Sequence, residues 1–210
     1  PSGEYELECI ARRIDGTDFF CGLTFPVGDD ALTLICGGWG GSITGVSCVD
    51  DEPAAEAAGW GRDPGPNRGL GLAFHFDHGS FVSHVAEVSA QGNRVRVEKF
   101  WSGVDCGPVL NLSGARNQVE GCIVDALSTA QLEITFANGA VDQSNFHDYM
   151  LATIDQSPEV ECHFIQGDHP PMGLGEPPIA PATPAMTNAI FAATGVRIRE
   201  QPWAKAGIIV

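Results

Sequence analysis

Residues 170–195 combine a loop rich in glycine and proline with a helix whose two ends are marked in the sequence, which leaves few alternatives for how this stretch folds. Thr183 suits the N-cap, Pro184 the first helical position and Gly195 the residue after the last turn. Apolar residues recur between them at helical spacing: Met186, Ala189, Ile190 and Ala193. The pattern therefore predicts a helix with one face packed on a core.

The loop ahead of this helix carries a single carboxylate, Glu176, preceded by two glycines and followed directly by two prolines. Glycine lets the backbone approach a neighbour closely, whereas proline restricts the conformations that the loop can adopt. A carboxylate held in this way can act on a bound group without reorganising first. The alternative is a solvated surface residue, which is the commoner state of an isolated glutamate.

A second helix is predicted after residue 111, with a buried stripe at spacings i, i+3, i+4, i+7, i+8 and i+11. The stripe consists of Val119, Cys122, Ile123, Ala126, Leu127 and Ala130. Gly114, Gln118 and Gly121 form a different row on the same helix. Glycine inside a helix is destabilising by about 1 kcal/mol, so a neighbouring group that packs closely against this row is one explanation for the two glycines. For Gln118 the alternative is an ordinary glutamine on the helix surface.

Strand-like patterns lie in four segments: residues 71–89, 94–101, 131–139 and 160–165. The order β, β, α, β, β, α over residues 69–195 predicts an α+β fold in which two helices pack on a mixed or antiparallel sheet. By composition the chain divides into four parts: a β-rich segment at 1–50, a linker at 51–68, the α+β region at 69–203 and a tail at 204–210.

Two further runs carry a resemblance to a known family. Gly173-Leu-Gly-Glu176-Pro-Pro-Ile-Ala-Pro, followed by Asn188-Ala-Ile-Phe-Ala-Ala-Thr-Gly-Val-Arg-Ile-Arg, resembles the carboxyl-terminal end of the large, molybdopterin-binding subunit of molybdenum hydroxylases. This is the xanthine dehydrogenase and aldehyde oxidase family, and the likeness is strongest to isoquinoline 1-oxidoreductase beta subunits. It covers about residues 58–203. The resemblance implies that Glu176 is the base that takes the proton from the molybdenum-bound hydroxyl.

The segment from Asp105 to Gly121 resembles the helix that contacts the cofactor in this family. The resemblance implies that Gln118 hydrogen-bonds molybdopterin, and that glycines at 114, 121 and 175 lie beside it. The family commonly has a glycine where this chain has Cys122. Residues 143–149 resemble a segment near the substrate channel, which implies that Ser144, Asn145 and Tyr149 line it. Structural hydrogen bonding is the alternative for these three.

The reaction implied by the resemblance is hydroxylation of an aldehyde or an N-heteroaromatic carbon, with water as the oxygen source. Electrons would leave to a [2Fe–2S] cluster on a small ferredoxin-like partner subunit. The family's other cofactor-binding loops lie upstream in a much longer subunit, so we expect an incomplete site in a fragment that is inactive alone. Cytoplasm and periplasm both remain open as compartments.

Residues 1–50 resemble part of the concanavalin-like β-sandwich of proteins related to 3-keto-disaccharide hydrolases, through short runs that include Gly37-Gly-Trp39-Gly-Gly. The resemblance offers a second function, carbohydrate binding or glycoside processing, with Trp39 as a stacking platform or simply a turn aromatic covering the sheet. A structural fragment without a ligand is a third interpretation. Since the two resemblances belong to unrelated families, the chain is expected to be a gene fusion, a processed fragment or a misjoined reading frame.

Composition argues against several other classes. Eleven basic residues stand against twenty-seven acidic ones, which argues against nucleic acid as a partner. No apolar run is long enough for a membrane span. Seven cysteines without a C-x-x-C pair lack the usual spacing of a zinc or iron–sulfur site. His75, His78 and His84 fit no common zinc pattern either, so no metal ligands are expected, and solvated or hydrogen-bonded strand histidines are favoured.

Overall fold

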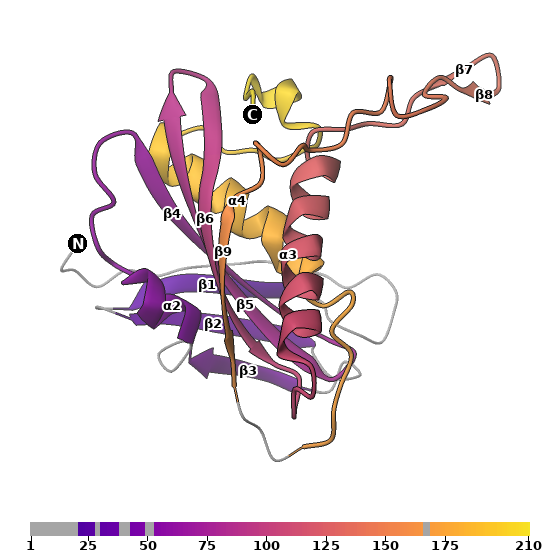
Figure 1. Cartoon of the computed structure of the whole chain (residues 1–210). Coiled ribbons are helices and arrows are strands. Elements are labelled where there is room, and N and C mark those ends of the chain that lie inside the picture. Colours follow the sequence, from indigo (N-terminus) through magenta and orange to yellow (C-terminus); the bar gives the residue numbers. More distant parts are fainter. Residues whose placement is uncertain (1–20, 28–29, 38–42, 49–52, 166–168) are drawn as a thin grey trace. The chain divides into compact units, whose positions relative to one another are not determined.

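The computed structural model describes residues 21–27, 30–37, 43–48, 53–165 and 169–210 (Figure 1). The chain forms two compact units, Pro1–Asp51 and Glu52–Val210, which are described separately. The first contains a three-stranded antiparallel sheet in the order β1-β2-β3. Its strands are β1 (Cys21–Val27), β2 (Asp30–Gly37) and β3 (Ile43–Cys48). The predicted β character of this segment is confirmed for these strands, while Trp39 lies outside the described residues.

The second unit is built on a four-stranded sheet in the order β4-β5-β6-β9. Its strands are β4 (Arg68–Asp77), β5 (Ser80–Gln91), β6 (Arg94–Asp105) and β9 (Glu159–Phe164). The first three are antiparallel, and β9 runs parallel to β6. The prediction of an α+β fold with a mixed sheet is therefore confirmed.

The segment predicted as one strand over residues 71–89 is in fact a hairpin. Its turn, Asp77-His78-Gly79-Ser80, has φ of 50° at His78 and 79° at Gly79. Positive φ at both central residues is what a type I′ turn requires. The turn has His-Gly where Asn-Gly or Asp-Gly would mark a type I′ hairpin, which is why the sequence pattern did not reveal it.

Two long helices, α3 (Leu112–Thr129) and α4 (Ile179–Thr194), pack with the sheet in one hydrophobic core. Every residue of the stripe predicted for the first of them is buried. On α4, Met186, Ala189 and Ile190 are fully buried, as predicted. Burial of these two apolar faces is the main source of stability that the structure offers.

The end of α4 is predicted correctly and its start is not. Gly195 is left-handed with φ of 76°, and its N–H donates to the Phe191 carbonyl at 2.8 Å. The helix begins at Ile179, more than a turn before the expected Pro184, and Pro178 takes the N-cap position instead of Thr183. Pro184 therefore lies inside the helix, where it removes one backbone hydrogen bond. Complete burial of the flanking Ala182, Ala185 and Met186 offsets this loss.

Strand β4 and helix α4 touch through their backbones. A Cβ built at Gly71 would lie 2.2 Å from both the Ala185 carbonyl oxygen and the Ala189 nitrogen, and Gly69 is equally close to the Ala189 carbonyl oxygen. No side chain fits there without moving the helix. These two glycines and the alanines that face them therefore set the position of α4 on the sheet.

Residues 132–158 leave the body of the second unit as an arm (Figure 1). Its two short strands are β7 (Phe136–Ala137) and β8 (Ala140–Val141). They are joined by a turn at Asn138-Gly139, with φ of 52° and 78°. The strand predicted over residues 131–139 is mostly wrong, because only β7 forms and it joins no larger sheet.

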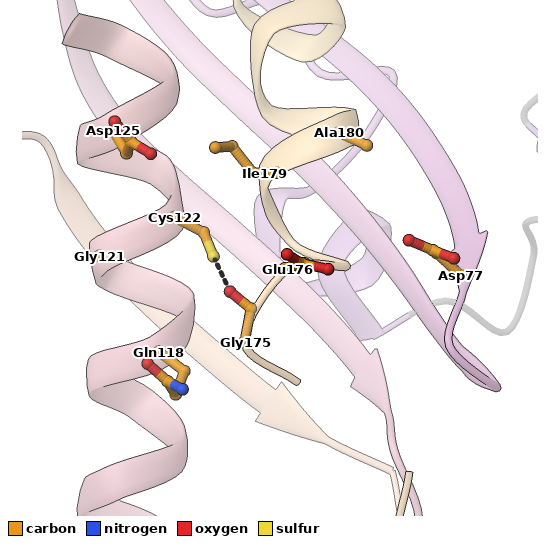
Figure 2. A pocket seen from close by; sticks show the side chains of 9 residues that line it. All are labelled: Asp77, Gln118, Gly121, Cys122, Asp125, Gly175, Glu176, Ile179 and Ala180. Carbon is orange, nitrogen blue, oxygen red and sulfur yellow. Dashed lines mark hydrogen bonds between the residues drawn. The ribbon is translucent and has the colours of Figure 1, made fainter. Parts of the chain in front are cut away.

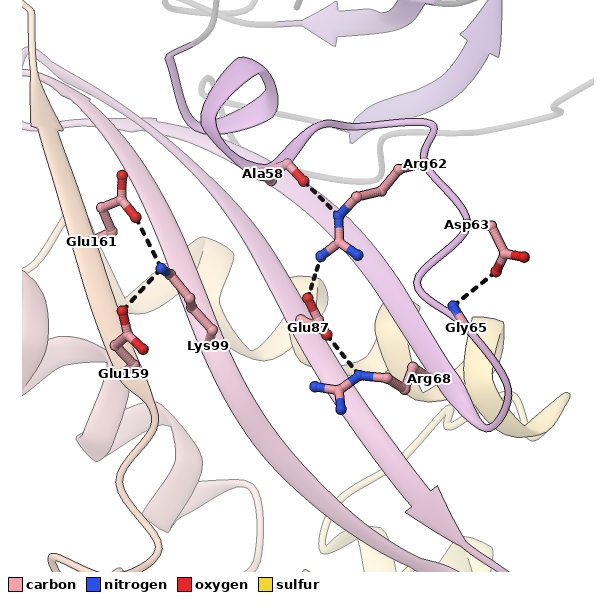
Figure 3. Close-up of polar contacts among 9 residues, drawn as sticks. All are labelled: Ala58, Arg62, Asp63, Gly65, Arg68, Glu87, Lys99, Glu159 and Glu161. Atoms are coloured by element: carbon pink, nitrogen blue, oxygen red, sulfur yellow. Dashed lines mark hydrogen bonds and ion pairs between the residues drawn. The ribbon is translucent and has the colours of Figure 1, made fainter.

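Ion pairs connect neighbouring elements of the sheet (Figure 3). Arg62 and Arg68 both pair with Glu87 of β5, which is only 7% exposed. A carboxylate so buried needs such partners, because removing them would leave an uncompensated charge. Lys99 of β6 pairs with Glu159 and Glu161 of β9, each at 2.9 Å. The second set fixes the parallel strand to its neighbour.

Both ends of the second unit contain regular structure. Residues 51–68 include the helix α2 (Pro53–Ala58), whose Ala54 and Ala58 are buried. At the other end, a 3-10 turn, η1 (Trp203–Ala206), overlaps residues 204–210, and after it the Ile209 carbonyl accepts from Val95 N–H at 2.8 Å. No helix in the described part of the chain is long and apolar enough to cross a membrane.

Candidate functional site

A cleft of about 520 Å³ opens between α3 and the start of α4 (Figure 2). It is lined by Asp77, Gln118, Gly121, Cys122, Asp125, Gly175, Glu176, Ile179 and Ala180. The lining comes from the β4–β5 turn, from one row of α3 and from the loop that ends at α4. The row predicted on α3 and the loop predicted around Glu176 thus face the same space.

Helix α3 supplies one wall. The helix starts at its N-cap Asn111, whose side-chain oxygen accepts from Gly114 N–H at 2.9 Å. From that start, Gln118, Gly121 and Asp125 reach the cleft at helical spacing. The Gln118 amide forms no hydrogen bond with any described residue, so it is available to a ligand. A Cβ at Gly121 would meet nothing within 4 Å, so this glycine leaves the wall open.

The loop that carries Glu176 supplies the other wall, and the β4–β5 turn holds it. Gly173 N–H donates to the His78 carbonyl at 3.3 Å, and the Ser80 hydroxyl donates to the Gly173 carbonyl. A Cβ at Gly173 would lie 2.8 Å from the Cβ of His78, so only glycine permits this contact. The inference that the loop glycines allow a close backbone approach is confirmed at this position.

The two walls are joined by Cys122 and Gly175. The Cys122 thiol donates to the Gly175 carbonyl oxygen at 3.1 Å (Figure 2). Burial raises the pKa of this thiol, and the nearby Asp125 and Glu176 carboxylates raise it further. The thiol therefore stays protonated at neutral pH and remains a donor. A Cβ at Gly175 would lie 3.4 Å from Nε2 of Gln118, which brings the loop against the α3 row.

Glu176 lies at the mouth of the cleft, with its side chain 76% exposed. Nε2 of His78 is 3.6 Å from one carboxylate oxygen of Glu176, and Nδ1 of His78 is 2.9 Å from a carboxylate oxygen of Asp77. The Glu176 carbonyl accepts from Ile179 N–H at 3.0 Å, which links this residue to the first turn of α4. The main chain at Glu176 is thus fixed, while its carboxylate, beside His78, stays exposed and accessible to a ligand.

The lining of the cleft is acidic. Asp77, Asp125 and Glu176 contribute carboxylates, and none of the nine lining residues is lysine or arginine. Such a surface repels an anionic group unless that group is held elsewhere. Within the described ranges, no group of three or more His, Cys, Asp and Glu residues is arranged to hold a metal ion.

Four of the predicted site residues meet at the cleft: Gln118, Gly121, Gly175 and Glu176. Gly114 does not line it, because a Cβ there would face the side chain of Asn111 at 3.3 Å. Ser144, Asn145 and Tyr149 lie on the arm, where the Ser144 and Asn145 N–H groups donate to the Asp148 carboxylate at 2.8 and 2.9 Å. The structure of this chain does not bring these three residues to the cleft.

Sequence reasoning missed the parts of the lining that depend on long-range contacts. Nothing in the sequence around Asp77 indicates a site residue, because its place in the lining depends on the β4–β5 turn. Cys122 falls on the buried stripe, and its donor role depends on the Gly175 carbonyl far along the chain. Asp125 follows the α3 row by one turn, so extending the spacing of Gln118 and Gly121 would have found it.

The comparisons with known proteins bear on this site. The sequence model described as "Molybdopterin cofactor-binding domain" matches residues 44–158, more than half of the chain. The chain belongs to this family. The match stops short of the Glu176 loop. It begins at residue 44, and nothing in these comparisons supports the concanavalin-like resemblance of residues 1–50.

Similar molybdopterin-binding domain proteins are much longer than this chain. This chain is 32% identical over 154 residues to the beta subunit of isoquinoline 1-oxidoreductase of Brevundimonas diminuta, and the match covers 70% of this chain and 20% of that protein. It is 31% identical over 147 residues to a nicotinate dehydrogenase protein of Pseudomonas putida, covering 64% of this chain and 12% of the relative. The chain thus spans a fifth or less of these two relatives.

A solved structure shows the same fold as this member of the family. Quinoline 2-oxidoreductase from Pseudomonas putida 86 matches with a TM-score of 0.54 and 24% identity, over 59% of this chain and 17% of that one. At this identity the likeness concerns the fold alone. The prediction from the sequence that this is part of a molybdopterin-binding region is confirmed.

Proposed function

We propose that this chain forms one wall of the cofactor and substrate site in the large subunit of a molybdenum hydroxylase. In this proposal Gln118 contacts molybdopterin and Glu176 is the general base. The observation that carries it is the shared cleft, which the Gln118 amide, unpaired among the described residues, and the exposed Glu176 carboxylate line from two separate elements. These are the two residues to which the resemblance assigns those roles.

The residues present suit part of the cofactor. A free amide offers both donors and an acceptor, which match the polar edge of a pterin ring. The open face of Gly121, where a Cβ would meet nothing within 4 Å, leaves room for a flat group beside the helix. The cofactor's phosphate finds no positive partner among the lining residues. We propose that segments outside this chain hold that phosphate and that the chain is inactive without them.

The proposed reaction replaces a C–H bond of the substrate by C–OH, takes the oxygen from water and releases two electrons and two protons. Molybdenum, when bound, supplies the activation of water and accepts the electrons. Glu176 accepts a proton at its carboxylate, and the fixed main chain on both sides holds it ready for this. The electrons would pass to a [2Fe–2S] cluster on a small ferredoxin-like partner subunit.

An aldehyde or an N-heteroaromatic compound is the proposed substrate class. The relatives named for isoquinoline and nicotinate support the second of these, because both names denote nitrogen heterocycles. The lining has three carboxylates and neither lysine nor arginine, which favours an uncharged ring over an anionic substrate.

The test uses the chain co-produced with the upstream part of the Brevundimonas diminuta protein and with an iron–sulfur partner. Molybdenum content and turnover of isoquinoline and benzaldehyde are measured. Glu176→Gln should lower kcat by about two to four orders of magnitude, the usual contribution of a general base, while leaving molybdenum bound. Full activity of this variant would remove the role of Glu176, and absence of molybdenum from the unsubstituted assembly would remove the proposal.

Glu133→Gln is the matched control. Glu133 is another exposed glutamate, with 46% of its side chain accessible, but it pairs with Lys205 at 2.8 Å and does not line the cleft. It should retain both molybdenum and turnover. Loss of activity in both variants would show that charge in general, and not the base, is responsible.

A further inference from the structure

We propose that His84 and Ser102 form a buried pair that positions the Glu176 loop, so that strand β5 holds this loop on both sides of the carboxylate. The catalytic meaning of the pair rests on the proposed function, whereas its effect on the loop does not. His84 is a positioning residue in this proposal, since it touches the loop and not the ligand.

The hydrogen bonds of His84 define one arrangement of its ring. The side chain is fully buried on β5, with Nε2 2.8 Å from the Pro178 carbonyl oxygen and Nδ1 2.9 Å from the Ser102 hydroxyl. A carbonyl oxygen only accepts, so Nε2 must carry the proton. Burial lowers the pKa of His84 to about 4, so the ring is neutral at pH 7, and Nδ1 is unprotonated and accepts from the Ser102 hydroxyl. The ring is neutral, in a single tautomer, with both nitrogens paired.

Sheet register makes this pair possible. His84 of β5 lies directly opposite Ser102 of β6, so the hydroxyl needs no unusual rotamer or loop to reach the ring. The edge of His84 also packs on Phe100, with ring centroids 5.5 Å apart in a T-shaped arrangement. A polar ring buried in this way is favourable only while both hydrogen bonds are made, which specifies where Pro178 must lie.

The Pro178 carbonyl is an effective point at which to fix the loop. Pro178 is buried, is the N-cap residue of α4 and lies two residues after Glu176. Neither Pro177 nor Pro178 has an N–H, so this part of the loop cannot anchor itself through its own backbone donors. This part of the loop is therefore held through its carbonyl groups, and His84 donates a hydrogen bond to that of Pro178.

Strand β5 also holds the loop on the other side of Glu176. Ser80, at the start of β5, donates to the Gly173 carbonyl. Ser80 and His84 are four residues apart on one strand, so their side chains point to the same face. One strand thus contacts the loop at Gly173 and at Pro178, and Glu176 lies between the two contacts.

The first experiment needs no cofactor and uses the whole 210-residue chain. Hydrogen exchange is measured at the Ile179 amide, which donates to the Glu176 carbonyl. His84→Leu removes both hydrogen bonds and should accelerate this exchange by about tenfold, while amides of the α3 core exchange as before. An unchanged rate at Ile179 would overturn the positioning role.

Two further variants make the test specific. His84→Gln keeps a donor for Pro178 and an acceptor for Ser102, so it should restore slow exchange. His163→Leu is the control, because His163 is a partly exposed strand histidine whose partner within the described ranges is Glu161 of its own strand. If His84→Leu does not fold, Ser102→Ala carries the test. It should raise exchange at Ile179 about threefold, and an unchanged rate would again overturn the proposal.

The second experiment asks whether positioning matters for turnover in the assembled enzyme. His84→Leu should lower kcat about tenfold with KM and molybdenum content nearly unchanged, and His84→Gln should recover most of kcat. Equal kcat values for His84→Leu and His84→Gln would overturn the proposal that His84 supports turnover by positioning the Glu176 loop. The outcomes stay distinguishable, because full activity of Glu176→Gln removes the proposed function without altering the exchange result at Ile179.

Discussion

The body of the second unit and its arm use apolar residues in opposite ways. In the body, Val119, Ile123 and Ile190 are completely buried. On the arm, Phe136 is 71% exposed, Phe146 73% and Ile154 93%. The arm is ordered by short polar contacts instead, such as the Thr135 hydroxyl donating to Asp142 at 2.7 Å. Burial therefore stabilises the body, whereas local side-chain hydrogen bonds shape the arm.

This difference means that the same substitution should have different effects in the two regions. The buried apolar residues of the body contribute to the free energy of unfolding, whereas the exposed side chains of Phe136, Phe146 and Ile154 on the arm contribute little. An exposed apolar surface of this kind is typical of a segment that contacts another part of a larger protein.

The largest contrast is expected between two isoleucines. Ile123→Ala in α3 should lower the free energy of unfolding by about 2–5 kcal/mol, because it removes fully buried methyl groups and leaves a cavity. Ile154→Ala on the arm should change it by less than about 0.5 kcal/mol. Urea denaturation followed by circular dichroism measures both. Similar losses for the two variants would contradict the division into body and arm.

A smaller contrast is expected between two histidines as the pH falls. Burial lowers the pKa of His84 to about 4, so the unfolded state, with an ordinary pKa near 6.5, binds the proton first. The stability that the neutral ring contributes is complete above pH 6.5 and is lost as the pH falls towards 4. At about 1.4 kcal/mol per pKa unit, this loss amounts to roughly 3 kcal/mol.

Denaturation midpoints between pH 7 and pH 4 provide the measurement. His84→Gln cannot titrate and should flatten the pH profile. His147→Gln on the arm should leave the profile unchanged, because that side chain is 76% exposed. A profile that His84→Gln does not alter would show that the buried ring is not the source of the pH dependence.

The smallest contrast concerns two asparagines that both accept a backbone N–H. Asn111 caps α3 by accepting from Gly114, and Asn145 on the arm accepts from Phe146 N–H at 2.8 Å. Asn111→Ala should lower the free energy of unfolding by about 1 kcal/mol. Asn145→Ala should leave global unfolding unchanged and only accelerate hydrogen exchange within the arm. Equal effects on global unfolding would mean that the arm folds together with the body.

The parts of the fold that could be predicted from the sequence are those set by local patterns. The stripe from Val119 to Ala130 and the stop at Gly195 are predicted correctly because spacing and glycine conformation decide them. The β4–β5 turn is not, since His78 adopts a positive φ that tertiary contacts with Gly173 support. The alternation in residues 131–139 is a strand pattern without a neighbouring strand, so only the turn and β7 form.

The candidate site divides in the same way. The roles expected for Gln118 and Glu176 come from the resemblance, because neither residue type at its position identifies a cofactor by itself. Their meeting at one cleft depends on how α3 and α4 pack, which no local pattern reveals. His84 gives the clearest example: its sequence neighbours favour a hydrogen-bonded histidine, but the Pro178 carbonyl as its partner appears only in three dimensions.

The arm is the covalent link between the two segments that line the cleft. Gln118 precedes the arm and Glu176 follows it, yet the segments on both sides share one core. A single proteolytic cut near Asn138-Gly139 would sever the chain without separating the cleft's two walls, and the two pieces should stay associated. The covalent link through the arm is thus dispensable for keeping these residues together.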